Sequence, residues 1–334
     1  MPRVMVAKRV CASLLLIEVR GLNGQAIRIR CSIGSRMSAP SMVIAPPLSG
    51  ATRPDPSCLN GDVGLSSDDR EAYLHFHRER NARLAHLSGV EGVRTFPMPC
   101  SVVEERSGSS PSRVAMDTFV RWCGRGVLER VSKPQIRVLD LGCGSGYARH
   151  LLADAGLSGT YIGLDHAKHP RFASFDCAAF APRLIVGDVH VLDPLDVGPV
   201  DLLISMTALE HFEDDARALE RARRVLAPGA GELHIVPGEK GLDLWGPHGW
   251  RQYSPHCVRR LCPGADIYRI GGYFSALVHE SMISHAPREA CERRQRFPGA
   301  YRLMRTCSHH LDRWTGNRPA SLYAAVVWPS GRRA

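Results

Sequence analysis

Residues 138–146 read Val-Leu-Asp-Leu-Gly-Cys-Gly-Ser-Gly, and this stretch decides the fold of the chain. Its first half is an apolar run typical of a buried strand, and its second half carries a glycine at every other position. Glycine lets the backbone turn tightly and lets a ligand lie against it, because no Cβ is in the way. In a doubly wound α/β sheet, ligands bind at such strand-to-helix turns. We therefore expect a ligand-binding turn at 142–146.

Downstream of this turn, short apolar runs alternate with helical patterns. Apolar residues at the helical spacing predict a helix over 148–155, directly after the glycines. Acids at its start and arginines at its end predict another helix over 214–226. Strands that alternate with helices form a parallel sheet covered on both faces. The predicted strands are 136–141, 161–164, 183–186, 200–205, 232–236, 267–270 and 322–327.

The predicted fold class is therefore α/β: a seven-stranded, mostly parallel, doubly wound (Rossmann-like) sheet with helices on both faces, plus a disordered N-terminal extension. Residues 1–65 are rich in Arg, Ser, Gly and Pro, and we expect them to form that basic extension. The remaining residues, 66–334, form the domain. Its parts are helices at 68–87 and 112–131, a core at 136–237, and a last part at 238–334 with a loop, a helical insertion at 272–320 and the last strand.

The extreme N-terminus has features of a targeting segment, but they are weak. Its apolar run at 10–17 is short, Glu18 ends it, and no small-x-small cleavage site follows. There are two alternatives to a signal peptide. One is an organelle transit peptide, and the other is a start codon assigned too far upstream, with Met37 or Met42 as the later start. We favour the second. The longest clean apolar run falls far short of the roughly 20 residues of a membrane helix, so we expect no membrane span.

The cysteines favour a reducing compartment. There are 11 of them, scattered along the chain without any Cys-x-x-Cys pair. This pattern argues against a zinc site or a disulfide framework, so we expect no metal and a cytoplasmic location.

The positive charge is concentrated at the two ends of the chain. Residues 1–60 hold eight basic and two acidic residues, a net charge of +6, and residues 287–334 hold ten and three, a net charge of +7. The chain total is +10, so 61–286 carry −3. A nucleic-acid interface concentrates its charge on the working face. The middle of the chain has no such excess, which argues against a nucleic-acid partner.

Three features of the glycine turn separate it from a dinucleotide-binding fingerprint. The spacing is Gly-x-Gly-x-Gly, and Tyr147 stands where the third glycine of the fingerprint would be. Asp140 places a carboxylate at the tip of the strand, two residues before the first glycine. Asp165 ends the next predicted strand, where a carboxylate binds ribose hydroxyls, a feature that NAD proteins share. An NAD(P)-dependent oxidoreductase is the alternative that this turn leaves open.

With these residues the sequence resembles the class I S-adenosylmethionine-dependent methyltransferases, most closely the type 11 group. Further segments match in the expected order: Gly187-Asp188 after the third strand, 201–206 as the fourth strand, Ala-Leu-Glu-His-Phe at 208–212, and Leu-Ala-Pro-Gly at 226–229. The resemblance covers 136–237, which becomes a cofactor-binding core, and implies S-adenosyl-L-methionine as the cofactor.

The resemblance also implies roles for individual residues. Gly142, Gly144 and Gly146 would line the methionine and ribose part of the cofactor. Asp140 would hold its amino end, Asp165 its ribose hydroxyls and Asp188 its adenine amine. Ser205, at the end of the fourth strand, joins this cofactor-binding set.

Two clusters follow strands four and five, where an acceptor would enter. The first is Glu210-His211, and the second is the loop 245–253, which packs two Trp, a Tyr, a His and an Arg into nine residues. We expect His211 or His248 to act as a general base, because the pKa of imidazole lies near neutrality. Arg251 would clamp an anionic group of the acceptor, with Glu210, Trp250 and Tyr253 beside it. The alternative is that these residues are structural and that the loop only covers the sheet edge.

The expected activity is methyl transfer to a small-molecule, sugar or lipid-linked acceptor, at oxygen. The enzymes that methylate amino groups of DNA bases carry an Asn/Asp-Pro-Pro-aromatic motif after strand four, and this chain has Ser-Met-Thr-Ala at 205–208. A catalytically silent scaffold, or an RNA-binding partner acting through the basic ends, is the alternative outside enzymes. The sequence leaves the acceptor and the oligomeric state open.

Overall fold

The chain divides into two compact units, Met1–Arg53 and Pro54–Ala334. This computed structural model describes residues 6–11, 14–20, 26–32, 55–85, 92–99, 109–131, 135–172, 177–191, 197–284, 294–314 and 319–330. In the first unit it describes three strands, which form an antiparallel sheet and were not predicted: β1 (Val6–Cys11), β2 (Leu14–Arg20) and β3 (Ala26–Ser32). The expectation of disorder for the rest of that unit falls on residues outside those described, and stays a prediction.

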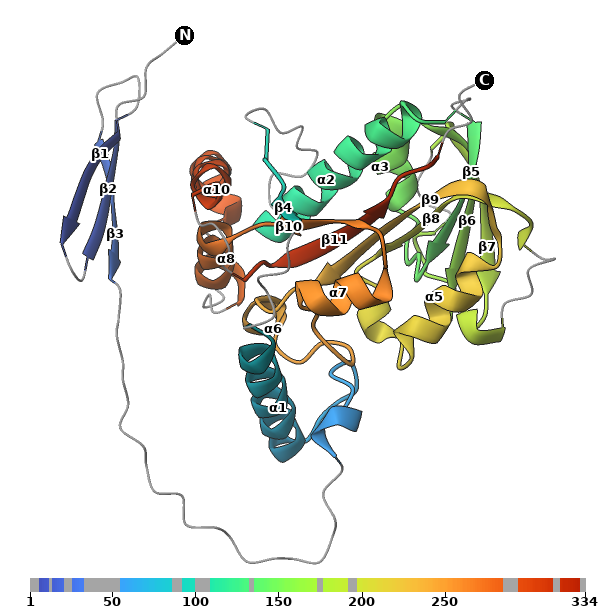
Figure 1. Cartoon of the computed structure of the whole chain (residues 1–334). Coiled ribbons are helices and arrows are strands. Elements are labelled where there is room, and N and C mark those ends of the chain that lie inside the picture. Colours follow the sequence, from blue (N-terminus) through green and yellow to red (C-terminus); the bar gives the residue numbers. More distant parts are fainter. Residues whose placement is uncertain are drawn as a thin grey trace, which may run out of the picture. The chain divides into compact units, whose positions relative to one another are not determined.

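The second unit is built on an eight-stranded sheet (Figure 1). The strand order is β4-β10-β11-β9-β8-β5-β6-β7, and only β11 runs antiparallel to its neighbours. All seven predicted strands are present, and β4 is an addition at the edge. The bounds are β4 (Val93–Thr95), β5 (Gln135–Leu141), β6 (Ser158–Asp165), β7 (Phe180–Val186), β8 (Val200–Met206), β9 (Leu226–Pro237), β10 (Asp266–Ile270) and β11 (Leu322–Val327). The predicted α/β class is confirmed.

Helices cover both faces of this sheet. One face packs against α2 and α3, and the other against α5 and α7. The helix bounds are α1 (Ser67–Ala85), α2 (Pro111–Leu128), α3 (Ala148–Asp154), α5 (Asp215–Arg223), α6 (Gly241–Trp245), α7 (Pro255–Leu261), α8 (Tyr273–His279) and α10 (Pro298–Asp312), with 3-10 turns η1 (Pro56–Cys58), η2 (Val189–Val191) and η3 (Leu209–His211) and a π-helical turn η4 (Glu280–Ser284). In the described part of the chain, no helix combines the length and apolar character that crossing a bilayer requires.

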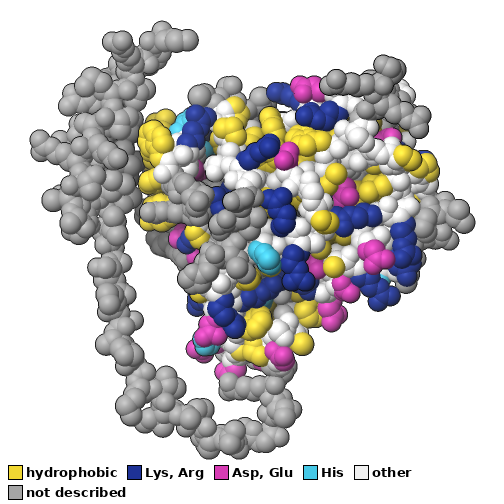
Figure 2. Space-filling model, in the orientation of Figure 1, with side chains coloured by type: hydrophobic (Ala, Val, Ile, Leu, Met, Phe, Trp, Pro, Cys, Tyr) yellow, Lys and Arg dark blue, Asp and Glu magenta, His cyan; other side chains and the backbone are white. Residues whose placement is uncertain are grey.

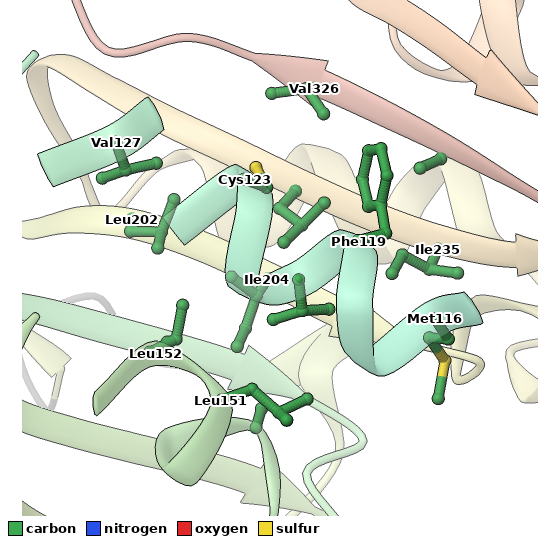
Figure 3. Packing of buried hydrophobic residues seen from close by; sticks show 14 of the residues in the cluster. Met116, Phe119, Cys123, Val127, Leu151, Leu152, Leu202, Ile204, Ile235 and Val326 are labelled. Atoms are coloured by element: carbon green, nitrogen blue, oxygen red, sulfur yellow. The ribbon is translucent and has the colours of Figure 1, made fainter. Parts of the chain in front are cut away.

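The helix α2 shows how the sequence pattern becomes packing (Figure 3). Its apolar face, with Phe119, Cys123 and Val127, lies on Ile204 and other side chains of the central strands. The glycines of α2 lie where neighbours come close: a Cβ on Gly124 would be 2.7 Å from the Cβ of Ala155. Glycine has a low helix propensity, but at these positions it lets two elements approach closely because it has no Cβ.

The helical insertion predicted between the last two strands is confirmed as α8, η4 and α10. Asp312 at the end of α10 accepts hydrogen bonds from the amides of Phe274 and Ser275, at 2.7 and 3.3 Å, in the first turn of α8. The carboxylate thereby satisfies amides that a helix start leaves without partners.

On the face that Figure 2 shows, basic and acidic side chains are interspersed.

A buried polar network lies under α5 and explains why charged residues interrupt β9. Arg223 donates two hydrogen bonds to Glu232, at 3.0 and 2.9 Å, and Nε2 of His234 donates to the same carboxylate at 3.0 Å. The hydroxyl of Ser205 lies 2.9 Å from Nδ1 of His234. Burial alone would raise the pKa of Glu232, but the hydrogen bonds from His234 and Arg223 outweigh it and bring the pKa to about 2.

We predict that Glu232→Gln lowers the free energy of unfolding by about 3 kcal/mol at neutral pH, because it breaks a buried ion pair. The folded pKa lies below the ordinary value of 4.5. The stabilisation is therefore present above about pH 4.5 and is lost as the pH falls towards about 2. Urea unfolding at several pH values measures both effects.

The matched control is Glu220→Gln, which removes an exposed partner of Arg224 on the same helix. Such surface pairs contribute little, so we expect a change within about 0.5 kcal/mol. Equal effects of the two substitutions would contradict the role given to the buried network.

Candidate functional site

The glycine turn after β5 has the backbone conformation that only glycine adopts easily. Gly142, Gly144 and Gly146 all have positive φ, at 65°, 49° and 69°. The amides of Gly142 and Cys143 donate to the carbonyl of Leu164 at 2.8 and 3.2 Å, which fixes the turn to the end of β6. The predicted ligand-binding turn therefore lies at the carboxyl ends of two neighbouring strands.

This turn is closed on one side and open on the other. A Cβ on Gly142 would lie 2.5 Å from the Cβ of Ala208, in the segment after β8. A Cβ on Gly144 would meet no atom within 4 Å. Thr207, next to Ala208, has a φ of 52°, a strained value for a β-branched residue. The turn is thus pressed against the segment that leads to Glu210, and its other side is free for a ligand.

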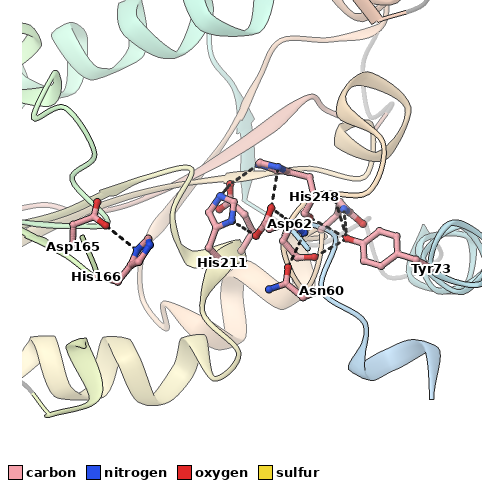
Figure 4. A network of polar contacts seen from close by, with 10 residues as sticks. Asn60, Asp62, Tyr73, Asp165, His166, His211 and His248 are labelled. Atoms are coloured by element: carbon pink, nitrogen blue, oxygen red, sulfur yellow. Dashed lines mark hydrogen bonds and ion pairs between the residues drawn. The ribbon is translucent and has the colours of Figure 1, made fainter. Parts of the chain in front are cut away.

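Asp165 lies beside the open side of this turn. Its Oδ2 accepts a hydrogen bond from the amide of Gly144 at 2.8 Å, and its Oδ1 lies 3.0 Å from Nδ1 of His166 (Figure 4). Asp188 follows β7, and its Oδ1 accepts from the amide of His190 at 2.9 Å. The two carboxylates occupy the ends of adjacent parallel strands, as the sequence predicted.

Asp140 is buried beneath the turn, with 2% of its surface exposed. Tyr161 donates a hydrogen bond to its Oδ2, and Oδ1 has no hydrogen-bond partner among the described residues. Burial raises the pKa of Asp140 to about 7, although the bond from Tyr161 lowers it. A buried carboxylate with one unused oxygen is suited to receive a cationic group.

Ser205 lies near the end of β8, the strand on which it was predicted. Its side chain is fully buried, and its hydroxyl bonds to His234 on the face of the sheet under α5. The predicted contact of Ser205 with the cofactor stays a prediction. Ser205, His234 and Glu232 are linked by hydrogen bonds in the same sequence of residue types as the catalytic triad of a hydrolase. Because Ser205 has no exposed surface, it cannot act as a nucleophile on an external substrate.

A second cluster forms where the chain leaves β8, and it unites the two predicted histidines. The rings of His211 and His248 are 4.7 Å apart and perpendicular. Glu210 is completely buried next to the two rings, with none of its surface exposed. Its Oε1 is 3.9 Å from Nε2 of His211 and 3.8 Å from Nε2 of His248.

Asp62 completes this cluster, and sequence reasoning missed it. Its Oδ2 lies 2.6 Å from Nδ1 of His211, and its Oδ1 accepts from the amide of Gly249 at 3.0 Å and lies 3.5 Å from Nδ1 of His248 (Figure 4). The residue was placed in a disordered extension ending at 65, whereas the unit boundary lies at Arg53/Pro54. Nothing in the local sequence marks Asp62, because its partners are 149 and 187 positions away.

The loop that carries His248 is anchored by Tyr73 of α1. The Tyr73 hydroxyl lies 3.0 Å from the carbonyls of His248 and Gly249, and Nε2 of Gln252 donates to it at 3.3 Å. Gly249 has a φ of 62°, and a Cβ there would lie 2.4 Å from the carbonyl of Glu210. His248 is therefore held on a packed loop, with an imidazole that is 38% exposed.

Two predicted acceptor-binding residues of this loop have structural partners instead. Nη1 of Arg251 pairs with Asp215 at 2.8 Å, and Arg251 also donates to the carbonyl of Glu213. Tyr253 is buried and donates to Oδ2 of Asp215 at 2.7 Å. Both side chains thus fasten the loop to α5, and their contact with an acceptor stays a prediction. Trp250 is half-buried, and its amide donates to the carbonyl of Glu210 at 2.7 Å.

The electrostatics of the cluster follow from its burial. Burial raises the pKa of Glu210 to about 8, and the nearby Asp62 adds to the rise. Burial alone would raise the pKa of Asp62, but the hydrogen bonds from His211 and Gly249 outweigh it and leave the pKa below its usual value. Burial and the neighbouring His211 lower the pKa of His248. At neutral pH the cluster therefore holds one ionised carboxylate and one carboxyl that is largely protonated.

Comparison with known proteins identifies the domain. A family model described as "Methyltransferase domain" matches residues 139–232. These residues belong to a class I S-adenosylmethionine-dependent methyltransferase domain of the type 11 group. The matched segment of this methyltransferase domain includes the glycine turn, Asp165, Asp188 and the Glu210-His211 pair.

Individual relatives cover only parts of the chain. An uncharacterised 37.1 kDa protein in transposon TN4556 of Streptomyces fradiae is 30% identical over 59% of this chain and 52% of its own length. The chloroplastic tocopherol O-methyltransferase of Arabidopsis thaliana is 29% identical over 53% of this chain and 54% of its own. The structure of a SAM-dependent methyltransferase from Archaeoglobus fulgidus aligns with a TM-score of 0.39 at 17% identity, over 63% of this chain and 93% of that one. The chain spans about half the length of the curated relatives it matches.

The residues of the methyltransferase domain fit S-adenosylmethionine. The open side of Gly144 leaves room against the backbone, Asp165 lies beside it, and the unused oxygen of Asp140 matches a cationic amino group. These residues, with Asp188 at the next strand, would hold the cofactor.

We predict that the affinity for S-adenosylmethionine rises several-fold between about pH 5.5 and 7.5. The pKa of Asp140 is raised to about 7, so its carboxyl is neutral at the lower pH and becomes an anion that attracts the cofactor's ammonium group as the pH rises. Asp140→Asn has no titrating carboxyl and should bind more weakly, with only the pH dependence of the ligand itself. Calorimetric titrations at several pH values measure this, and identical pH profiles for the two proteins would contradict it.

Proposed function

We propose that the protein transfers a methyl group from S-adenosylmethionine to a hydroxyl oxygen of a small-molecule, sugar or lipid-linked acceptor. The observation that carries this proposal is the position of the His211–His248 pair. His211 lies in the segment after β8, which packs directly on the glycine turn through Ala208 and Gly142. His248 comes from the loop after α6 and lies against His211. An imidazole in the segment that packs on the glycine turn favours an acceptor that must lose a proton.

His211 has the surroundings of a general base. Asp62 accepts from Nδ1 of His211 at 2.6 Å and so fixes the tautomer that leaves the Nε2 lone pair free. His211 is 37% exposed, so an acceptor can reach it. His248 stands beside it as the second candidate. Oxygen methylation also agrees with the name of one relative, a tocopherol O-methyltransferase.

The reaction needs little more from the protein than position and proton removal. When bound, S-adenosylmethionine supplies a methyl group on a positively charged sulfur. The glycine turn and the carboxylates of Asp140 and Asp165 would orient the cofactor and with it the methyl group. His211 would take the proton of the acceptor hydroxyl as the hydroxyl oxygen attacks the methyl carbon. Orientation of two reactants contributes up to about 7–11 kcal/mol in good intramolecular examples.

We predict that His211→Ala lowers kcat for methyl transfer by about 10²–10⁴-fold with little change in cofactor affinity. The matched control is His75→Ala, which removes an exposed histidine from α1 and should leave both unchanged. The measurement is transfer of label from methyl-tritiated S-adenosylmethionine to a panel of sugars, phenols and hydroxy acids, with calorimetry for cofactor binding.

Three outcomes would contradict the proposal. Label that moves only to amine or thiol acceptors would overturn the choice of oxygen. Cofactor binding without transfer to any acceptor would favour the silent scaffold. Nicotinamide cofactor binding without S-adenosylmethionine binding would revive the oxidoreductase alternative.

A further inference from the structure

The cluster around Asp62 has the chemistry of a metal site. Three segments far apart in the sequence meet there: the turn after η1, the turn η3 and the loop after α6. Asp62, His211 and His248 each offer one ligand atom, and these atoms all lie within 4.8 Å of one another. Two imidazoles and one carboxylate are a donor set that binds divalent transition metals.

Glu210 provides an independent observation that points to a cation. Its carboxyl has no exposed surface, and neither oxygen has a hydrogen-bond partner among the described residues. Its Oε1 lies 3.8–3.9 Å from Nε2 of both His248 and His211, a separation that one ion between these atoms would bridge. A buried carboxyl without hydrogen bonds is costly unless something compensates it.

The backbone holds these donors in place before any ligand arrives. The amide of Gly61 donates to the carbonyl of Gly249 at 2.8 Å, and the amide of Trp250 donates to the carbonyl of Glu210 at 2.7 Å. A Cβ on Gly61 would lie 2.2 Å from the amide nitrogen of His248, so only glycine permits this approach. Rigid segments that fix ligand positions are what a selective metal site requires.

We propose that His211 and His248, through their Nε2 atoms, bind one divalent transition-metal ion together with Glu210, while Asp62 on the Nδ1 side orients the two rings. The fitting class of ion is Zn²⁺, Co²⁺, Mn²⁺ and Fe²⁺. Imidazole favours these ions over Mg²⁺ and Ca²⁺, which prefer oxygen ligands only. Asp62, His211 and His248 are each about one-third exposed, so the ion keeps open positions towards the outside.

The role of the ion rests on the proposed function. An acceptor hydroxyl that coordinates the ion loses its proton to water more easily, because the metal lowers its pKa. Its oxygen lone pair then forms the bond to the methyl carbon as the bond from that carbon to the cofactor's sulfur breaks. In the loaded site, His211 is a ligand instead of the proton acceptor.

The test is a titration of Co²⁺ and Zn²⁺ into the whole untagged chain of 334 residues after removal of metal by a chelator. We expect one Co²⁺ per chain, with the visible d–d absorption of a site that contains imidazole. His211→Ala removes a ligand and should weaken binding by at least about 100-fold, and Asp62→Asn, which removes the partner of Nδ1, should weaken it by about 10–100-fold. The control His75→Ala removes an exposed histidine that also has a carboxylate neighbour, Glu79, and should leave binding unchanged.

Binding that is equal in His211→Ala and in the unmodified protein, or no binding to either, would overturn the proposal. Circular dichroism of each variant excludes loss of folding as the cause. Titration of S-adenosylmethionine into the metal-free protein separates this proposal from the proposed function. Cofactor binding without metal binding would contradict only the proposed metal site. Metal binding without cofactor binding would contradict only the proposed methyl transfer.

Discussion

The contact between Gly142 and Ala208 is the constraint on which both halves of the site depend. The turn after β5 and the segment after β8 approach so closely that a Cβ on Gly142 would be 2.5 Å from that of Ala208. The approach fixes the cofactor turn, and it also fixes the start of the segment that carries Glu210 and His211. The strained φ of 52° at Thr207 shows that the backbone accepts an unfavourable conformation to make this junction.

The two halves follow different physical rules. On the cofactor side, carboxylates stand at the ends of adjacent parallel strands, an arrangement that topology alone produces once the sheet is formed. On the acceptor side, Asp62 and His248 come from segments outside the sheet and are held by Tyr73 and by backbone hydrogen bonds. The first half lies within the residues that match the family model, and Asp62 and His248 of the second half lie outside them.

The sequence predicted the parts of the fold that local patterns determine. Apolar runs gave all seven of the main strands, and the spacing of Asp140, Asp165 and Asp188 placed them correctly at strand ends. The edge strand β4 was missed because Val-Arg-Thr is too short and polar to stand out. The contacts of Ser205 with His234 and of Arg251 and Tyr253 with Asp215 could not be predicted, because sequence position does not tell which partner a side chain finds.

The most direct test of the central claim is calorimetric titration of S-adenosylmethionine into the unmodified chain and into Asp165→Ala. The account predicts micromolar binding to the unmodified protein and a loss of about 100-fold in the variant, since a charged hydrogen-bond acceptor beside the glycine turn is removed. No binding to a well-folded unmodified protein, or equal binding to both, would contradict the account.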